Sequence, residues 1–409
     1  MLDVKLGSLL GQPEVSAFLR GIVSRGRYAN AYLFHGPAGV GKCTAALSFA
    51  RAALCERVPG AAPVESEPSL FAEATPAAGR AGDDACGECR GCAMAGTLQH
   101  PDLHFLFPVS AKDTKGDAQK IDDAIIEVFE ALRKNALHVF QYERAASIRI
   151  DQTRELQAQL AYRPHTASRR VVVVRDCDRM REDQFSALLK SIEEPAATTV
   201  WVLTTSRLSR VPVTIRSRCQ RVRFAPLAES LVRDVLRDKA GVADEKKARL
   251  LAAISTGSLG RALAMRDEPD MAIERDAAIT LLSPPAADRF GGLWAAVQKS
   301  TGYGKAGRER LRLRIEFQQL WLRDLLRARY GAPRESLVSP ERHDALRAQA
   351  ASLDAREIRR RLMVLEEALR SIEGNISPDL ALFSTMARAA GDRLGERAWP
   401  AHPTGRWDV

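Results

Sequence analysis

Residues 36–44 read Gly-Pro-Ala-Gly-Val-Gly-Lys-Cys-Thr, which has the spacing of a phosphate-binding P-loop with one substitution. Because the G-x-x-x-x-G-K pattern is intact, backbone N–H groups could surround a phosphate and Lys42 could reach its terminal oxygens. A Ser or Thr hydroxyl normally follows the lysine and holds Mg²⁺, but this chain has Cys43. A thiol is a soft ligand, whereas Mg²⁺ prefers oxygen. The loop therefore predicts a nucleotide phosphate site that does not favour hydrolysis, formed by Gly36, Gly39, Gly41, Lys42, Cys43 and Thr44.

Short apolar runs alternate with helical patterns, which is typical of an α/β fold with a parallel sheet. Five strands are expected, at 31–34, 103–107, 171–174, 200–203 and 221–224. Between the third and fourth strands, one helical face is predicted to carry Phe185, Leu188, Leu189 and Ile192. After residue 224 the strand signals stop, and long Arg-rich helical segments follow at 308–330 and 354–373.

The sequence predicts three domains, with boundaries near residues 226 and 270. These are a core at 1–225, a small helical domain at 226–270 and an all-helical domain at 271–409. The stretch 56–85, with four prolines and many alanines, has the composition of a flexible insertion. A second insertion, at 112–147, is expected to contain an amphipathic helix from Ile121 to Asn135.

The chain of 409 residues has 61 basic and 51 acidic residues, a formal net charge of +10 and a pI near 9.4. A basic balance is compatible with nucleic-acid contact, but arginines that solvate helix faces give the same total. No run approaches the ~18 apolar residues that span a bilayer, and the first residues lack the features of a signal peptide. We expect a soluble, cytoplasmic protein without membrane contact.

Three of the seven cysteines form the run Cys86-x-x-Cys89-x-x-Cys92. An odd number of cysteines without a secretory signal argues against a disulfide framework. Cys55 is the natural fourth ligand, because it ends the helix expected after the P-loop. A closed Cys₄ site is typical of structural zinc. Iron–sulfur clusters use the same run, and His100 is a weaker candidate for the fourth ligand.

Several motifs occur in order: the P-loop, the cysteine insertion, Leu-Leu-Lys-Ser-Ile-Glu-Glu-Pro at 188–195 and Thr-Ile-Arg-Ser-Arg-Cys at 214–219. This order closely resembles the clamp-loader subunits of bacterial DNA polymerase III, which are AAA+ proteins. The resemblance covers essentially the whole chain apart from the two insertions. His-Pro-Asp-Leu at 100–103 and Asn375-x-x-Pro378-x-Leu380 resemble the delta-prime type more than the gamma/tau motor type.

The resemblance implies an AAA+ core with a zinc module at about 55–92, a helical lid and a helical collar. It also implies a heteropentameric ring with gamma/tau-like and delta-like subunits, which loads the sliding clamp onto primed DNA as part of the polymerase III holoenzyme. Arg218 would act in trans as an arginine finger on a neighbour's ATP. In other phosphoryl-transfer systems such an arginine contributes ~10³–10⁵ in rate.

Hydrolysis by the chain itself is expected to fail at three places. In the family's active members, an acid that orients Mg²⁺ and a Glu that activates water end the third strand. Here Arg175 occupies the position of the first acid, and Asp176 occupies that of the Glu. If the alignment is moved by one residue, Asp176 and Cys177 occupy these two positions instead. Gly260 stands where motor subunits place a phosphate-sensing arginine, and Cys43 is the third defect. The neighbouring residues Arg261 and Thr44 are not expected to replace the arginine at position 260 and the hydroxyl at position 43. A step of one residue along a helix rotates the side chain by ~100°.

The sequence therefore favours a subunit that is neither a polymerase nor a competent ATPase and that could bind ATP or ADP without turnover. Arg175 would then supply a fixed positive charge in place of Mg²⁺. Two alternatives stay open at this point. One is an ATP-hydrolysing gamma/tau-like motor subunit, and the other is a zinc-stabilised DNA-binding module with a vestigial AAA+ core.

Overall fold

The computed structural model describes residues 4–59, 82–110, 126–131, 146–148, 150–193, 198–266, 271–282, 294, 297, 304–371 and 378–390. The chain forms two compact units, Met1–Gly241 with Ser255–Met265, and Val242–Ile254 with Arg266–Val409. The three predicted domains remain predictions. The 56–85 insertion is described only at its ends, and the expected helix at 121–135 only over 126–131, which is helical.

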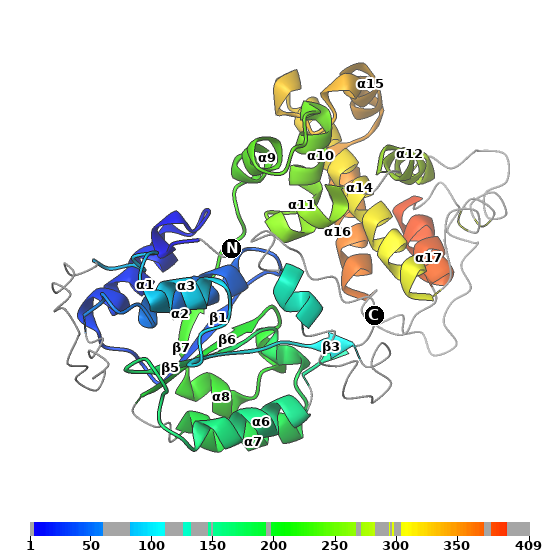
Figure 1. Cartoon of the computed structure of the whole chain (residues 1–409). Helices are drawn as coiled ribbons and strands as arrows, with labels where there is room; N and C mark the ends of the chain where they lie inside the picture. The colour runs from blue at the N-terminus through cyan, green and yellow to red at the C-terminus, as the bar shows by residue number, and fades with distance from the viewer. Residues whose placement is uncertain are drawn as a thin grey trace, which may run out of the picture. The chain divides into compact units, whose positions relative to one another are not determined.

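A five-stranded parallel sheet forms the centre of the first unit, in the order β2-β5-β6-β1-β7 (Figure 1). The prediction of this sheet is confirmed, and each expected strand is present. In the register of the central pair, Leu33 of β1 lies beside Leu203 of β6. The strands are β1 Ala31–His35, β2 Leu103–Leu106, β5 Arg170–Val174, β6 Thr199–Thr205 and β7 Gln220–Arg223.

Helices cover both faces of this sheet, which explains why β5 is almost continuous valine and buried throughout. Side chains alternate between the faces, so Phe34 and Val173 join one core while Leu33 and Trp201 join the other. Helices α1 Pro13–Arg25, α2 Lys42–Ala53 and α3 Arg90–Gly96 supply the first core (Figure 1). Helices α6 Ile150–Leu160, α7 Glu182–Glu193 and α8 Val213–Arg218 supply the second (Figure 1).

The apolar face predicted for the helix between β5 and β6 is confirmed for α7 where its side chains are described. Phe185, Leu188 and Ile192 are buried in the second core, while the side chain of Leu189 lies outside the described residues. Smaller elements complete the unit. They are η1 Leu6–Ser8, β3 Val109–Ser110, β4 Ala146–Ser147, η2 Cys177–Arg179, η3 Leu208–Arg210, α9 Glu229–Asp238 and α11 Leu259–Arg266, whose last residue belongs to the second unit.

Every described element of the second unit is helical. Helix α14 packs against α12, α15, α16 and α17, and an apolar core that includes Leu311, Ile315 and Leu365 lies between them. The elements are α10 Glu245–Ile254, α12 Met271–Leu281, α14 Gly304–Arg329, η4 Arg334–Ser336, η5 Pro340–Arg342, α15 His343–Ser352, α16 Ala355–Ser371 and α17 Pro378–Ala390. Among the described residues, none of the helices combines the length and apolar composition that a bilayer crossing requires.

Candidate nucleotide site and metal centre

The P-loop connects β1 to α2, so it lies at the carboxyl edge of the sheet, where ligands of open parallel sheets bind. Lys42, the first residue of α2, is buried, and its Nζ donates hydrogen bonds to the carbonyl oxygens of Gly36, at 2.8 Å, and Pro37. Burial lowers the pKa of Lys42 to about 8. The loop's own carbonyl groups thus receive hydrogen bonds that a bound phosphate could take.

The segment that begins α11 lies against the P-loop within the same unit. The N–H of Gly260 donates to the carbonyl oxygen of Gly39 over 2.9 Å. Gly39 has φ +72°, and a Cβ there would lie 2.3 Å from the Oγ of Ser258. A Cβ on Gly260 would lie 2.9 Å from the Cα of Gly39. In this arrangement, position 260, where the resemblance leads us to expect a phosphate-sensing arginine in motor subunits, has no room for a side chain.

Arg175 follows β5 directly and lies beside the P-loop. Its Nε forms an ion pair with Oδ2 of Asp176 at 3.3 Å, and the arginine side chain is only 15% exposed. Burial raises the pKa of the Cys43 thiol, while a hydrogen bond with Arg175 and the guanidinium charge oppose that rise. The same charge contributes to the lowered pKa of Lys42. A cation therefore lies next to the thiol that replaces the usual Mg²⁺ ligand.

The two acidic residues that follow β5, Asp176 and Asp178, form hydrogen bonds with threonines at the end of β6. Asp178 is buried, and its Oδ1 accepts a hydrogen bond from Oγ1 of Thr205, at the end of β6, over 2.7 Å. Asp176 has φ +47°, and its backbone N–H donates to Oγ1 of Thr204. Both acidic residues after β5 are therefore bonded to neighbouring protein groups.

Arg218 is the last residue of α8 and is partly exposed. Its Nη2 forms an ion pair with Oε1 of Glu193 at 2.8 Å, and its Nη1 donates to the carbonyl oxygen of Thr214 at 3.1 Å. Glu193 belongs to the Glu-Glu-Pro part of the 188–195 motif, but sequence reasoning assigned it no role.

The structure brings together the four cysteines that were expected to bind metal. The Sγ atoms of Cys55, Cys86, Cys89 and Cys92 all lie within 4.8 Å of one another. Cys86 and Cys92 are 3.8 Å apart at sulfur, as are Cys55 and Cys89. Four sulfurs arranged tetrahedrally at 2.3 Å from one ion are separated by roughly 3.8 Å. This cluster can hold a metal ion, and His100 is not among the described residues whose ligand atoms gather there. The Nδ1 of His100 instead accepts a hydrogen bond from the N–H of Asp102.

Local backbone geometry supports the cysteine cluster. The N–H of Cys89 donates to the sulfur of Cys86. The N–H of Cys92 donates to the sulfur of Cys89, which is the N-cap residue of α3. Gly87 has φ +85°, and a Cβ on Gly91 would lie 2.5 Å from the carbonyl oxygen of Leu54. Both glycines thus meet conformational demands of the turns around the cluster.

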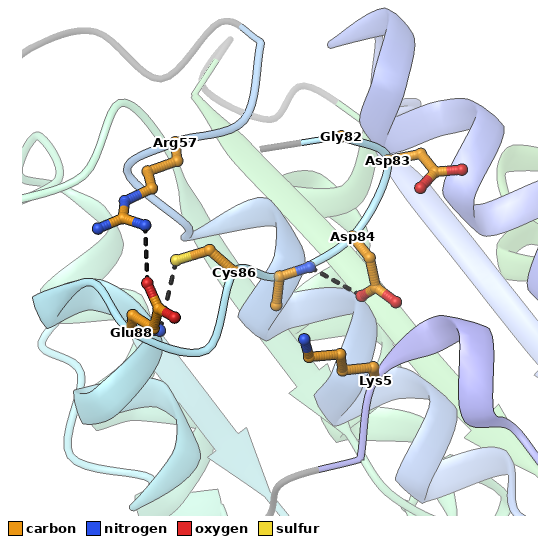
Figure 2. A pocket seen from close by; sticks show the side chains of 8 residues that line it. Lys5, Arg57, Gly82, Asp83, Asp84, Cys86 and Glu88 are labelled. Carbon is orange, nitrogen blue, oxygen red and sulfur yellow. Dashed lines mark hydrogen bonds and ion pairs between the residues drawn. The ribbon is translucent and has the colours of Figure 1, made fainter. Parts of the chain in front are cut away.

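The cluster is tied to the P-loop helix and to the start of the chain. Arg51 of α2 is buried, and its Nε donates to the carbonyl oxygen of Cys92. The carboxylate of Asp84 accepts from the N–H groups of Leu6 and Gly7. A pocket of about 350 Å³ lies beside these contacts (Figure 2). The charged and thiol side chains that line it are Lys5, Arg57, Asp83, Asp84, Cys86 and Glu88.

A P-loop after strand β1, with helices on both faces of a five-stranded parallel sheet in the order β2-β5-β6-β1-β7, defines a protein of the AAA+ class. The family described as "DNA polymerase III, delta subunit" matches residues 11–69 and 66–228, more than half of the chain. The chain belongs to this family of DNA polymerase III clamp-loader subunits.

Three curated relatives show the extent of the similarity. The DNA polymerase III subunit delta' of Pseudomonas aeruginosa is 30% identical over 276 residues, which cover 68% of this chain and 60% of that protein. The delta' subunit of Bacillus subtilis is 23% identical over 366 residues, which cover 90% of this chain and 92% of that protein. The tau subunit of B. subtilis is 23% identical over 264 residues, which cover 64% of this chain and 37% of that protein. The match thus spans less than two thirds of the P. aeruginosa and tau proteins.

Proposed function

We propose that this chain is a delta-prime-like clamp-loader subunit that does not hydrolyse ATP. It assembles with gamma/tau-like and delta-like subunits in a heteropentameric ring, donates Arg218 to a neighbouring ATPase site, and helps to load the sliding clamp onto primed DNA in the cytoplasm. The observation that carries the proposal is the position of Arg175, which lies beside Cys43 and pairs with Asp176.

Hydrolysis in P-loop enzymes needs a divalent cation at this point, held by a hydroxyl and a carboxylate. Here a thiol and a guanidinium take those two positions, and Asp176 is already paired with that guanidinium. A buried positive charge repels Mg²⁺, and a thiol binds it poorly. The contact between Gly260 and Gly39 also leaves no space for an arginine that would sense the γ-phosphate.

Binding of ATP or ADP without turnover is compatible with this site. Lys42 and the loop N–H groups remain, and Arg175 adds positive charge where Mg²⁺ would otherwise neutralise phosphate. For a phosphate to enter, Lys42 must exchange the carbonyl oxygens of Gly36 and Pro37 for phosphate oxygens.

Zinc is the proposed metal of the cysteine cluster. Four thiolates in a tetrahedral arrangement leave no open coordination position, so a bound zinc ion would be structural rather than catalytic. Cys55 follows the P-loop helix α2, whereas Cys86 and Cys89 precede α3 and Cys92 lies in its first turn. The ion would therefore fix the 82–96 segment to the end of α2.

The trans-acting role of Arg218 can be tested in a reconstituted ring. Arg218→Ala should lower DNA-stimulated ATPase by about tenfold or more, because the transition-state charge loses its donor. Arg25→Ala removes an exposed arginine from the end of α1, which contributes to the opposite core, and should leave the rate unchanged. Assembly should be normal in both variants by size-exclusion chromatography. An Arg218→Ala ring with unchanged ATPase would overturn the proposed finger.

The second candidate is a gamma/tau-like motor subunit, which is favoured by the intact G-x-x-x-x-G-K loop and by the similarity to a tau subunit. A turnover assay on the isolated chain separates the two. Mg²⁺-dependent ATP hydrolysis that disappears on Lys42→Ala would establish the motor and exclude the stator. We expect no turnover above the level of the Lys42→Ala variant.

A further inference from the structure

Two acceptors from two different helices hold the guanidinium of Arg218. Oε1 of Glu193, at the end of α7, lies 2.8 Å from Nη2, and the carbonyl oxygen of Thr214, one turn earlier in α8, lies 3.1 Å from Nη1. The two side chains are 42% and 32% exposed. The arginine is therefore at the surface but is bonded at both terminal nitrogens.

The helices that carry this pair are fixed by the core. Ile192, next to Glu193, is buried, and so are Ile215 and Cys219 on either side of the Arg218 turn. Helices α7 and α8 pack against each other on the same face of the sheet. The distance between Glu193 and Arg218 is thus set by buried neighbours rather than by two free surface side chains.

A guanidinium has five N–H donors in one plane, and these two bonds leave others available. A free arginine side chain must give up rotamer freedom when it binds an anion, and a guanidinium already fixed in one plane gives up less. An ion pair at one edge of the planar group therefore presents the unused N–H groups at its other edges to an incoming phosphate in a defined direction.

We propose that Glu193 is a positioning residue for Arg218. Through the ion pair it orients the guanidinium toward nucleotide phosphate held by a neighbouring subunit. This inference rests on the proposed trans-acting role of Arg218 and adds the group that prepares the arginine for that role. Glu193 itself does not touch the nucleotide, and its effect passes entirely through Arg218.

A double-mutant cycle in the reconstituted ring tests the inference. The variants are Glu193→Ala, Glu193→Gln, Arg218→Ala and the double variant with alanine at both positions. Glu14→Ala, which removes an exposed carboxylate from the first turn of α1, is the matched control. DNA-stimulated ATPase is measured as kcat and KM for ATP, and assembly and thermal unfolding are measured for every variant.

Glu193→Ala should lower kcat about threefold to tenfold with KM unchanged, which is the size of effect expected when two contacting residues are coupled. Glu193→Gln keeps an acceptor oxygen and should recover most of that loss. In the Arg218→Ala background, Glu193→Ala should have no further effect. Glu14→Ala should match the wild type.

The outcomes separate this inference from the proposed function. If Arg218→Ala leaves ATPase unchanged, the arginine finger fails and the role of Glu193 falls with it. If Arg218→Ala lowers ATPase while Glu193→Ala does not, only the positioning role is overturned. The same holds if Glu193→Ala lowers the rate equally with and without Arg218, or if Glu193→Gln is as impaired as Glu193→Ala. Should Glu193→Ala fail to assemble, the Glu193→Gln ring decides, because a rate equal to that of Arg218→Ala also overturns positioning.

Discussion

The N–H of Gly260 donates to the carbonyl oxygen of Gly39 over 2.9 Å, and a Cβ on Gly260 would lie equally close to the Cα of Gly39. This contact joins the start of α11 to the P-loop within one compact unit. Together with the bonds from Lys42 to Gly36 and Pro37, it holds the loop through hydrogen bonds within the chain itself.

The first prediction concerns a variant that places an arginine at position 260, where the proposed function has motor subunits carry one. Gly260→Arg should destabilise the chain by about 1–3 kcal/mol, as overpacking does, and should not produce ATPase activity. Thermal unfolding and a turnover assay measure both effects. Gly82→Arg is the matched control, because an added Cβ there has nothing within 4 Å. A gain of hydrolysis in Gly260→Arg would show that the P-loop and α11 separate readily.

The second prediction uses the pKa of Lys42, which burial lowers from 10.5 to about 8. Between these two pH values the unfolded chain retains a proton that the folded chain has released. The free energy of unfolding contributed by this group therefore rises with pH across that window. Urea unfolding at pH 7.5 and 9.5 should show a larger gain, or a smaller loss, for the wild type than for Lys42→Met. Identical pH dependence in the two proteins would contradict a buried, perturbed lysine.

The third prediction concerns nucleotide binding without Mg²⁺. If Arg175 neutralises phosphate in place of the metal, ADP should bind the isolated chain equally well with and without a chelator. Arg175→Ala should weaken that binding by about tenfold, since hydrogen bonds between charged groups contribute about 1.5–3 kcal/mol. Isothermal calorimetry measures the change, and Arg25→Ala serves as the control. Binding that requires Mg²⁺, or that is unaffected by Arg175→Ala, would argue against this role.

The sheet and the cysteine cluster could be predicted because local sequence determines both. A short run of β-branched residues such as the valines at 171–174 favours a buried strand, and the spacing of Cys86, Cys89 and Cys92 already resembles a metal site. The preference for Cys55 over His100 comes from its expected place at the end of the helix after the P-loop, and Cys55 does lie two residues beyond the last residue of α2, Ala53.

The contacts that complete the site could not be predicted in the same way. Gly39 and Gly260 lie far apart in the sequence. A glycine in a sequence does not indicate which backbone segment packs against it, so this contact is known only from the fold. Glu193 stands in a recognised motif, but its bond to Arg218 depends on how α7 and α8 pack. The pairing of Arg175 with Asp176 involves adjacent residues, yet its nearness to Cys43 depends on the order of β5, β6 and β1 in the sheet.

The fourth prediction concerns the metal. Metal analysis should find about one zinc ion per chain, and Cys86→Ser should lose most of it, because a Cys₄ site needs all four thiolates. The loss should loosen residues 82–96 while the sheet stays folded, since Cys86 lies outside the strands. Hydrogen exchange should therefore rise in 82–96 and near Leu6 and Gly7, which bond to Asp84, but not in β1, β5 or β6.

Cys219→Ala, which replaces a buried cysteine away from the cluster, is the control and should retain the metal. Global unfolding of Cys86→Ser, with exchange rising throughout the sheet, would mean that the metal supports the whole core rather than this segment.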